Sequence, residues 1–471
     1  MSPQQAFAVF RVDEAQMQAL IRETLSQGAS WADLFFEKST YTAATLCDGA
    51  VSSGSIHVDY GVGIRALKGE RTGYAYCEST RKEDMLRAAR TAGAIASRTS
   101  GSALDFSAAG VPAGNHYPFS RSWNDVSAAQ MVECLGRIES LIREKDSRVT
   151  KVMASVSCCE SIVMMYNSLG ELSADLRPMG SVSASITFRD GRGQETKSVS
   201  RSFRRGAEML CDSLPEEIAS EVVKGMDELL EAGRPEGGQM SVVIGAGAGG
   251  ILLHEAVGHA FEADFIRKGQ SIFTGRIGEK VCLEGISIVD DGTFEGNRGA
   301  CNVDDEGVAG QKTYMVRDGR LESYLHDRIS AAYFGVSPTG NGRRESFRNN
   351  PIPRMRLTYM ENGDSAPEDI IASVKKGVYV DEFSNGQVQI GEGDFTFYVR
   401  SGRLIENGRL TAPIKDINII GNGPEALADI VGVGNDLRID NSRWICGKDQ
   451  SVPVGCGMPM VLIKSLTVGG K

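Results

Sequence analysis

Between positions 231 and 238 the apolar pattern of the chain lapses into Glu-Ala-Gly-Arg-Pro-Glu-Gly-Gly. Glycine and proline interrupt helices and strands, so neither kind of element is expected to run through this segment. The chain has 471 residues, which is longer than a single hydrophobic core usually supports. We therefore predict two domains, one over residues 1–235 and the other over residues 236–471.

Residues before this break combine helical and strand-like patterns. Apolar side chains recur at helical spacing over 131–142 and again over 218–229. Over 182–188 every second residue is apolar, and this run leads into Asp190-Gly191, a pair typical of hairpin turns. Helices packed on antiparallel strands make an α+β fold, which we predict for the N-terminal domain.

Residues after the break are rich in turn signals. Asp318-Gly319, Ser401-Gly402 and Asn407-Gly408 lie between short β-branched or aromatic runs such as 395–399. The chain has 55 glycines, a share above the average of about 7% that suits a sheet domain with many tight turns. We predict a C-terminal domain that is mainly antiparallel β and barrel-like, with few helices.

Composition and charge exclude several classes of protein. A formal net charge of −10 would repel a phosphate backbone, so we expect no nucleic-acid partner. No apolar stretch reaches the length of a membrane span, and the first residues lack the basic start of a secretory signal. The ten cysteines form no CxxC pairs and do not suggest a disulfide framework in a chain this long. These observations predict a cytoplasmic protein without a membrane partner.

Two histidines and a glutamate lie close together in His254-Glu255-Ala-Val-Gly258-His259. In the common zinc-peptidase motif H-E-x-x-H, the histidines are four residues apart on one helical face, and the glutamate acts on the attacking water. Here the spacing is five residues, which separates the side chains by roughly 140° on an ideal helix. A single π-type turn would return them to one face, and Gly258 makes such a distortion easy. The segment therefore predicts a metal site on a distorted helix of the C-terminal domain.

Two other interpretations of this region remain open on the residues alone. The histidines could be buried, hydrogen-bonded residues of a core helix. The preceding Gly245, Gly247 and Gly250 match the dinucleotide fingerprint G-x-G-x-x-G. That fingerprint needs a second strand shortly after the helix, yet the next strand-like run is 286–289. The dinucleotide hypothesis is therefore weak, and the glycines more simply allow a tight turn or a close approach of a substrate chain.

The residues alone leave the third ligand of a catalytic zinc open. Such a site usually takes three protein ligands and keeps a fourth position for water. His326 is the best of the remaining histidines, although the role of a surface or hydrogen-bonded histidine fits it better. Glu262 or Asp264 could supply a carboxylate, and a thiolate could come from Cys446, beside a lysine, or from the rival Cys456.

The segment Gly247–His259 closely resembles the signature of the TldD/PmbA metallopeptidases, on the TldD side. The similarity covers the second domain densely and the first domain loosely. Sister subunits of the PmbA type commonly lack the two histidines, so the resemblance points to the catalytic side. Further matching motifs are Asp304–Gly307, His326–Arg328, Gly340–Arg344, Gly393–Phe397, Cys446–Lys448, Gln450–Gly455 and Leu466–Gly470.

The resemblance implies a zinc ion held by His254, His259 and Cys446, with Glu255 as general base. Cys456 would then be a small packing residue. It also implies a cytoplasmic peptidase acting on unfolded peptides, as a homodimer or as a heterodimer with a PmbA/TldE-like sister subunit. The alternative is a non-enzymatic regulatory subunit, in which a further ligand such as His326 or Glu262 would close a structural zinc site.

Five arginines lie close together at positions 343, 344, 348, 354 and 356. They could bind a peptide carboxylate, because guanidinium groups match carboxylates in shape and charge. Arginine is mostly exposed in proteins, however, so a solvated charged face is the favoured interpretation.

Overall fold

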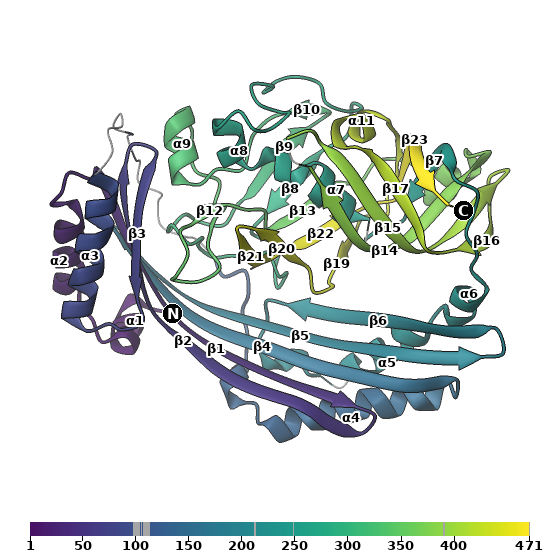
Figure 1. The fold of residues 1–471 in the computed structure, drawn as a ribbon, viewed down its shortest axis with the longest axis horizontal. Helices are drawn as coiled ribbons and strands as arrows, with labels where there is room; N and C mark the ends of the chain where they lie inside the picture. The colour runs from purple at the N-terminus through teal and green to yellow at the C-terminus, as the bar shows by residue number, and fades with distance from the viewer. Residues whose placement is uncertain are drawn as a thin grey trace.

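The computed structural model describes residues 1–97, 104, 106, 114–211, 213–247, 249–389 and 391–470. Figure 1 shows a long curved sheet formed by the N-terminal half, and above it a rounded body formed by the C-terminal half. The C-terminal body lies against one face of the curved sheet, and helices cover the other. This arrangement is the α+β fold expected from the sequence.

The N-terminal sheet has six antiparallel strands in the order β3-β2-β1-β4-β5-β6. Its turn between β5 and β6 pairs Asp190 with Gly193, at the hairpin signal expected there. Side chains alternate between the two faces, as in any strand. The bounds are β1 Trp31–Cys47, β2 Ala50–Lys68, β3 Arg71–Cys77, β4 Val149–Asn167, β5 Leu172–Asp190 and β6 Gly193–Phe203.

Helices cover the outer face of this sheet in two groups (Figure 1). One group packs on the end formed by β1 and β2, and the other packs on β4 and β5. The helical pattern over 218–229 forms two short helices, because Gly225 adopts a φ of 73° and ends the first. The bounds are α1 Pro3–Phe10, α2 Glu14–Leu25, α3 Lys82–Ser97, α4 Ala128–Lys145, α5 Ser213–Val223 and α6 Met226–Glu231.

The C-terminal body contains a closed barrel of five strands, as the sequence predicted. The strands follow the order β14-β7-β23-β17-β15, and pairing between β14 and β15 closes the ring. All neighbours are antiparallel except β7 and β14. The bounds are β7 Gly238–Ile244, β14 Lys376–Val388, β15 Asp394–Glu406, β17 Ile417–Asn422 and β23 Val461–Gly469, with β16 Arg409–Ile414 and β18 Ile430–Val433 at its sides.

A second sheet of the C-terminal body has the order β10-β9-β8-β13-β22-β19. Helix α7, Gly250–Ala256, contacts β14 and β15 of the barrel and β13 and β22 of this sheet. The strand bounds are β8 Ile288–Asp291, β9 Lys312–Arg317, β10 Arg320–Leu321, β13 Leu357–Met360, β19 Arg438–Asp440 and β22 Gly455–Met458. Two small hairpins complete the body: β11 Gly342–Arg343 with β12 Ile352–Pro353, and β20 Ile445–Lys448 with β21 Gln450–Pro453.

The turn signals of the C-terminal half behave differently from one another. Asp318-Gly319 and Asn407-Gly408 form two-residue turns, and all four residues have positive φ. Ser401-Gly402 was wrongly predicted as a turn, because it lies inside β15 where the pairing with β14 shifts register. The glycine there allows close approach, since a Cβ would lie 2.2 Å from the Tyr379 carbonyl oxygen.

The other helices of the C-terminal body are short. Within the described residues, no helix combines the length and apolar character needed to cross a membrane. The bounds are α8 Ala263–Arg267, α9 Arg328–Phe334, α10 Pro367–Ala372 and α11 Gly423–Ala428, with the 3₁₀ turns η1 Trp123–Asp125, η2 Ala207–Met209 and η3 Gly258–Phe261.

Candidate metal centre

The helix that carries the first histidine ends before the second. Helix α7 stops at Ala256, Val257 adopts a φ of −127°, and the 3₁₀ turn η3 begins at Gly258. The expected π-type turn is therefore wrong, and a break followed by a tighter turn solves the spacing instead. A Cβ at Gly258 would lie 2.1 Å from the Met355 sulfur, so a larger residue would push the turn away from its neighbour.

The glycines before α7 bring the helix against the second sheet. Gly247 has a φ of 91°, and a Cβ at Gly250 would lie 2.5 Å from the Gly457 backbone nitrogen in β22. The strand after α7, β8, belongs to a different sheet from β7. The glycines thus serve tight packing, and the strand arrangement of a dinucleotide fingerprint is not followed.

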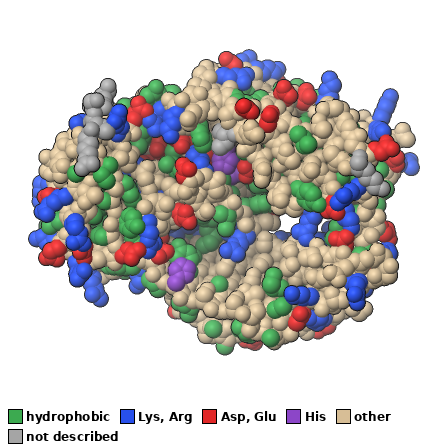
Figure 2. Space-filling view, viewed as in Figure 1, with side chains coloured by type: hydrophobic (Ala, Val, Ile, Leu, Met, Phe, Trp, Pro, Cys, Tyr) green, Lys and Arg blue, Asp and Glu red, His purple; other side chains and the backbone are tan. Residues whose placement is uncertain are grey.

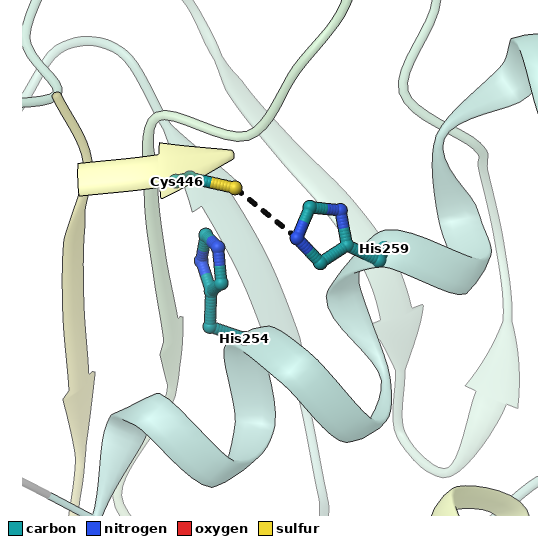
Figure 3. Close-up of side chains that lie close together, drawn as sticks. All are labelled: His254, His259 and Cys446. Atoms are coloured by element: carbon teal, nitrogen blue, oxygen red, sulfur yellow. Dashed lines mark hydrogen bonds between the residues drawn. The ribbon is translucent and has the colours of Figure 1, made fainter. Parts of the chain in front are cut away.

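Three side chains from distant parts of the sequence converge beside this break. His254 lies in α7, His259 in η3 and Cys446 in β20, and their nitrogen and sulfur atoms all lie within 4.8 Å of one another. Figure 3 shows them facing one another, with Cys446 Sγ 3.1 Å from His259 Nε2. All three residues are buried.

The hydrogen bonding of His254 fits a metal ligand. Both of its ring nitrogens are buried and neither has a hydrogen-bond partner among the described residues. Buried polar atoms are nearly always paired, so an isolated imidazole in this position is an incomplete site. Two imidazoles and one thiolate match the ligand chemistry of zinc.

Glu262 orients His259 from outside the cluster. Its Oε2 atom lies 2.8 Å from His259 Nδ1, which leaves Nε2 facing Cys446 and His254. A carboxylate bonded to the outer nitrogen of a histidine fixes the ring and raises its basicity. Glu262 is itself completely buried and forms ion pairs with Lys448 at 3.0 Å and Arg354 at 3.6 Å.

The buried charges of this network set the protonation of the two neighbouring ligands. Burial alone would raise the pKa of Cys446, but His254 and His259 outweigh it and lower that pKa to about 4. Burial alone would lower the pKa of His259, but Glu262 and Cys446 hold it well above its usual range. Without a metal, the cluster is therefore a thiolate beside a protonated imidazole.

Glu255 lies next to the cluster without belonging to it. Its Oε2 atom is 3.8 Å from His259 Nε2, and its side chain is 20% exposed. Its carboxylate therefore lies near one of the three converging atoms and is partly open to solvent.

The other ligands considered from the sequence lie outside the cluster of converging atoms. Cys456 is packed in the hydrophobic core of the C-terminal body, and burial raises its pKa well above the usual range. His326 lies beside Ser330 and Phe334, and burial lowers its pKa to about 4. Asp264 accepts a hydrogen bond from Lys448 at 2.7 Å.

The expectation of a solvated arginine face is wrong. Arg343, Arg344, Arg354 and Arg356 are all at least 95% buried, and only Arg348 is partly exposed. Arg344 and Arg348 form ion pairs with Asp33 and Asp59 of the N-terminal sheet, and Arg354 pairs with Glu262 beside the metal centre. Arg354, for example, donates to the carbonyl oxygen of Cys446 at 2.7 Å. Its role was not foreseen, because nothing in the sequence links positions 354 and 446.

Family models match nearly the whole chain. Residues 32–96 match the PmbA/TldA metallopeptidase domain 1, residues 121–229 match the central domain, and residues 237–470 match the C-terminal domain. The third match contains all three converging residues and Glu255.

Known proteins of similar sequence carry names consistent with these models. A metalloprotease TldD homolog of Haemophilus influenzae is 40% identical over 93% of both chains. A zinc metalloprotease TldD homolog of Saccharolobus solfataricus is 32% identical over 54% of this chain and 57% of its own length. The crystal structure of TldE from Thermococcus kodakarensis matches with a TM-score of 0.75 and 21% identity, covering 97% of this chain and 100% of that one.

Proposed function

The chain belongs to the PmbA/TldD metallopeptidase family, and we propose that it hydrolyses peptide bonds with a zinc ion held by His254, His259 and Cys446. The observation that supports this most is the convergence of three buried ligand atoms, together with a His254 ring whose nitrogens have no other partner among the described residues. The Saccharolobus relative is named a zinc metalloprotease, which supports zinc as the metal.

The residues around the cluster have separate roles in the proposed hydrolysis. A zinc ion bound there would act as a Lewis acid toward the scissile carbonyl and acidify the attacking water. Glu255 accepts the proton of that water and returns it to the leaving amine. Glu262 keeps His259 in the orientation that directs Nε2 at the metal.

The burial of the ligands favours flexible peptides as substrates. His254, His259 and Cys446 are each no more than 4% exposed, so a rigid folded surface cannot approach them closely. Unfolded peptides or small unfolded proteins can approach these ligands. We also propose that the chain works in the cytoplasm as a homodimer or with a TldE-like sister subunit, because its fold matches that of TldE from Thermococcus.

A structural zinc in a non-enzymatic subunit is the second candidate. It would require a fourth protein ligand that excludes water. The two residues considered for that role are engaged elsewhere: Glu262 with His259 Nδ1, Lys448 and Arg354, and His326 with Ser330. The peptidase is therefore the better supported proposal.

One experiment tests the proposal directly. The metal content of the purified chain is measured beside the cleavage of an unstructured peptide, with and without chelator. We expect about one zinc ion per chain and activity that chelation removes. Glu255→Gln should keep the metal and reduce cleavage roughly 10²- to 10⁴-fold, since it removes only the proton acceptor.

Glu279→Gln is the matched control, because Glu279 is an exposed glutamate that pairs with Arg276 and is not among the converging residues. It should leave the rate unchanged. A zinc-loaded Glu255→Gln chain with full activity would contradict the general-base role, and a chain that loses its zinc would identify Glu255 as a ligand.

A further inference from the structure

A cavity of about 370 Å³ lies between the N-terminal sheet and the C-terminal body. Figure 2 shows the molecule hollowed between these two parts, with basic side chains on the walls. Strands β1, β4 and β5 line one side, and the hairpin of β20 and β21 lines part of the other. We call it the arginine cavity after the seven arginines in its walls: Arg177, Arg204, Arg298, Arg343, Arg344, Arg356 and Arg443.

The acidic residues of the arginine cavity do not balance this charge. Its walls contain Glu37, Asp305 and Glu345. Asp305 is already paired with Arg177 at 2.5 Å. Burial raises the pKa of Glu37, which weakens its negative charge. The cavity therefore carries a net positive charge.

Four of the seven arginines are buried and have no carboxylate partner among the described residues. Arg204, Arg298, Arg343 and Arg356 are each at least 92% buried and form no ion pair there. Their side chains donate hydrogen bonds to neutral groups: Arg298, for example, donates to Ser181 Oγ at 3.3 Å and to the Trp444 carbonyl at 3.1 Å. The Nε atoms of Arg204 and Arg298 have no hydrogen-bond partner in the part of the chain that the structure describes.

Such an arrangement is costly without a negative charge in the cavity. A buried ion is tolerated when it is paired, and removal of its partner is strongly destabilising. Burial, together with the like charges of Arg443 and Arg204, lowers the pKa of Arg298 to about 9. Every one of these features would be relieved by an anion bound between the guanidinium groups.

We propose that the arginine cavity binds a carboxylate group of the peptide substrate. The inference rests on the proposed peptidase function and names the group by which a peptide is recognised. Guanidinium groups pair with carboxylates in a planar, two-point geometry. A peptide offers such a carboxylate at its C-terminus or on an acidic side chain, so it is the anion that the proposed substrate itself supplies to the seven arginines.

The arginine cavity and the metal centre share one structural element. Val452 in β21 lines the cavity and pairs with Cys446 in β20. Arg343 of the cavity donates to the Pro453 carbonyl at 2.7 Å in the same hairpin. A peptide anchored by its carboxylate in the cavity is therefore held against the hairpin that carries the proposed thiolate ligand.

The test compares one unstructured peptide in three forms: with a C-terminal carboxylate, with a C-terminal amide, and with that amide plus a glutamate side chain. Affinity is measured for the full chain carrying Glu255→Gln, so that cleavage is slow compared with the measurement. We expect the carboxylate forms to bind roughly 10- to 100-fold more tightly than the uncharged amide. The first and third forms distinguish a chain end from an acidic side chain as the source.

Two variants then test whether the preference for a carboxylate depends on the arginine cavity. Arg298→Met removes a buried arginine, and Arg443→Gln removes an exposed one at the edge of the cavity, where folding is not at risk. Both should abolish the preference for carboxylate. Arg192→Met is the matched control, because Arg192 is exposed and paired with Asp190 away from the cavity.

Equal affinity for all three forms would overturn the assignment, as would a preference that survives both cavity variants. The proposed function is tested separately by zinc content and cleavage rate. A carboxylate preference in a chain without peptidase activity would support the cavity and refute the function, and the converse result would do the opposite.

Discussion

The metal centre and the arginine cavity lie on the same hairpin, yet they handle buried charge in opposite ways. Around the metal centre, Glu262 is matched by Lys448, Arg354 and a protonated His259. In the arginine cavity, Arg298 and three other buried arginines have no matching carboxylate among the described residues. We call the paired charges around Glu262 the balanced frame; they surround His254, whose ring nitrogens have no hydrogen-bond partner among the described residues. We call the unpaired buried arginines around the cavity the unbalanced frame.

The difference teaches what each site needs. At the metal centre the unfilled requirement is for a group that accepts lone pairs from His254, which is a cation. In the arginine cavity the unfilled requirement is for an anion, which accepts hydrogen bonds from the guanidinium groups. Under the two proposals together, a peptide would be held by its carboxylate in the cavity while its scissile bond was polarised at the metal centre.

The largest expected effect tests the balanced frame itself. Arg354 is completely buried, pairs with Glu262 and donates to the Cys446 carbonyl. Because Arg354→Met breaks a buried ion pair, we expect the free energy of unfolding to fall by about 3–5 kcal/mol. Denaturant titration measures it, and a loss below about 1 kcal/mol, typical of surface pairs, would show that the frame is not needed for stability.

The next effect separates the two buried cysteines of this region. Cys446→Ala should weaken zinc binding by more than about 100-fold, since even the loss of an outer partner costs 10- to 100-fold. Cys456→Ala should leave zinc binding unchanged, because Cys456 lies in the hydrophobic core. Competition with a chromophoric chelator measures both affinities. The reverse pattern would reassign the third ligand.

Glu262→Gln tests the outer partner of His259. It keeps the shape of the side chain and removes the charge that holds the imidazole, so zinc affinity should fall by about 10- to 100-fold. Asp264→Asn is the control, because Asp264 also bonds to Lys448 but does not contact His259. If both variants bind zinc equally well, the orientation of His259 does not depend on Glu262.

The pH dependence of zinc binding follows from the two shifted ligands. The pKa of Cys446 near 4 means that the thiolate is already formed at neutral pH. The raised pKa of His259 means that its proton must leave before zinc can bind. Affinity should therefore rise about tenfold per pH unit through neutrality, up to the pKa of His259, with about one proton released per zinc. Calorimetry in buffers of different ionisation enthalpy counts the released protons. Zero release would contradict a protonated His259 beside a Cys446 thiolate in the metal-free chain.

The smallest effect belongs to the unbalanced frame. Arg298→Met loses hydrogen bonds to Ser181 and Trp444 but also removes an uncompensated charge. These terms oppose each other, so we expect the free energy of unfolding to change by less than about 1 kcal/mol without ligand. A loss as large as that of Arg354→Met would mean that the cavity arginines are structural, and the comparison would fail.

Local patterns in the sequence predicted the elements of the fold better than their partners. The alternation over 182–188 became part of β5, and the turns at Asp318-Gly319 and Asn407-Gly408 formed as expected. Ser401-Gly402 failed because a glycine can serve close packing inside a strand as well as a turn. The domain limits at 235 and 236 remain a prediction.

The sequence predicted the two histidines of the candidate site more directly than Cys446 or the buried arginines. His254 and His259 are neighbours in sequence, so their spacing alone pointed to a metal, although the break at Val257 was not the expected distortion. Cys446 was one of several candidates on the residues alone, and only the family resemblance favoured it over Cys456, because the fold joins it to the histidines across a long stretch of chain. The buried arginines were misjudged, since general exposure of arginine says nothing about a cavity formed between two domains.

The closure of the barrel has a kinetic consequence. Strand β7 pairs with β23, and Ser241 donates to the Lys464 carbonyl across 223 residues of sequence. The N-terminal sheet, by contrast, is built largely from hairpins between consecutive strands. Contacts between distant residues form slowly because a long loop must first close. The N-terminal half should therefore fold first. The candidate metal centre, which needs Cys446 beside α7, should form in the last step.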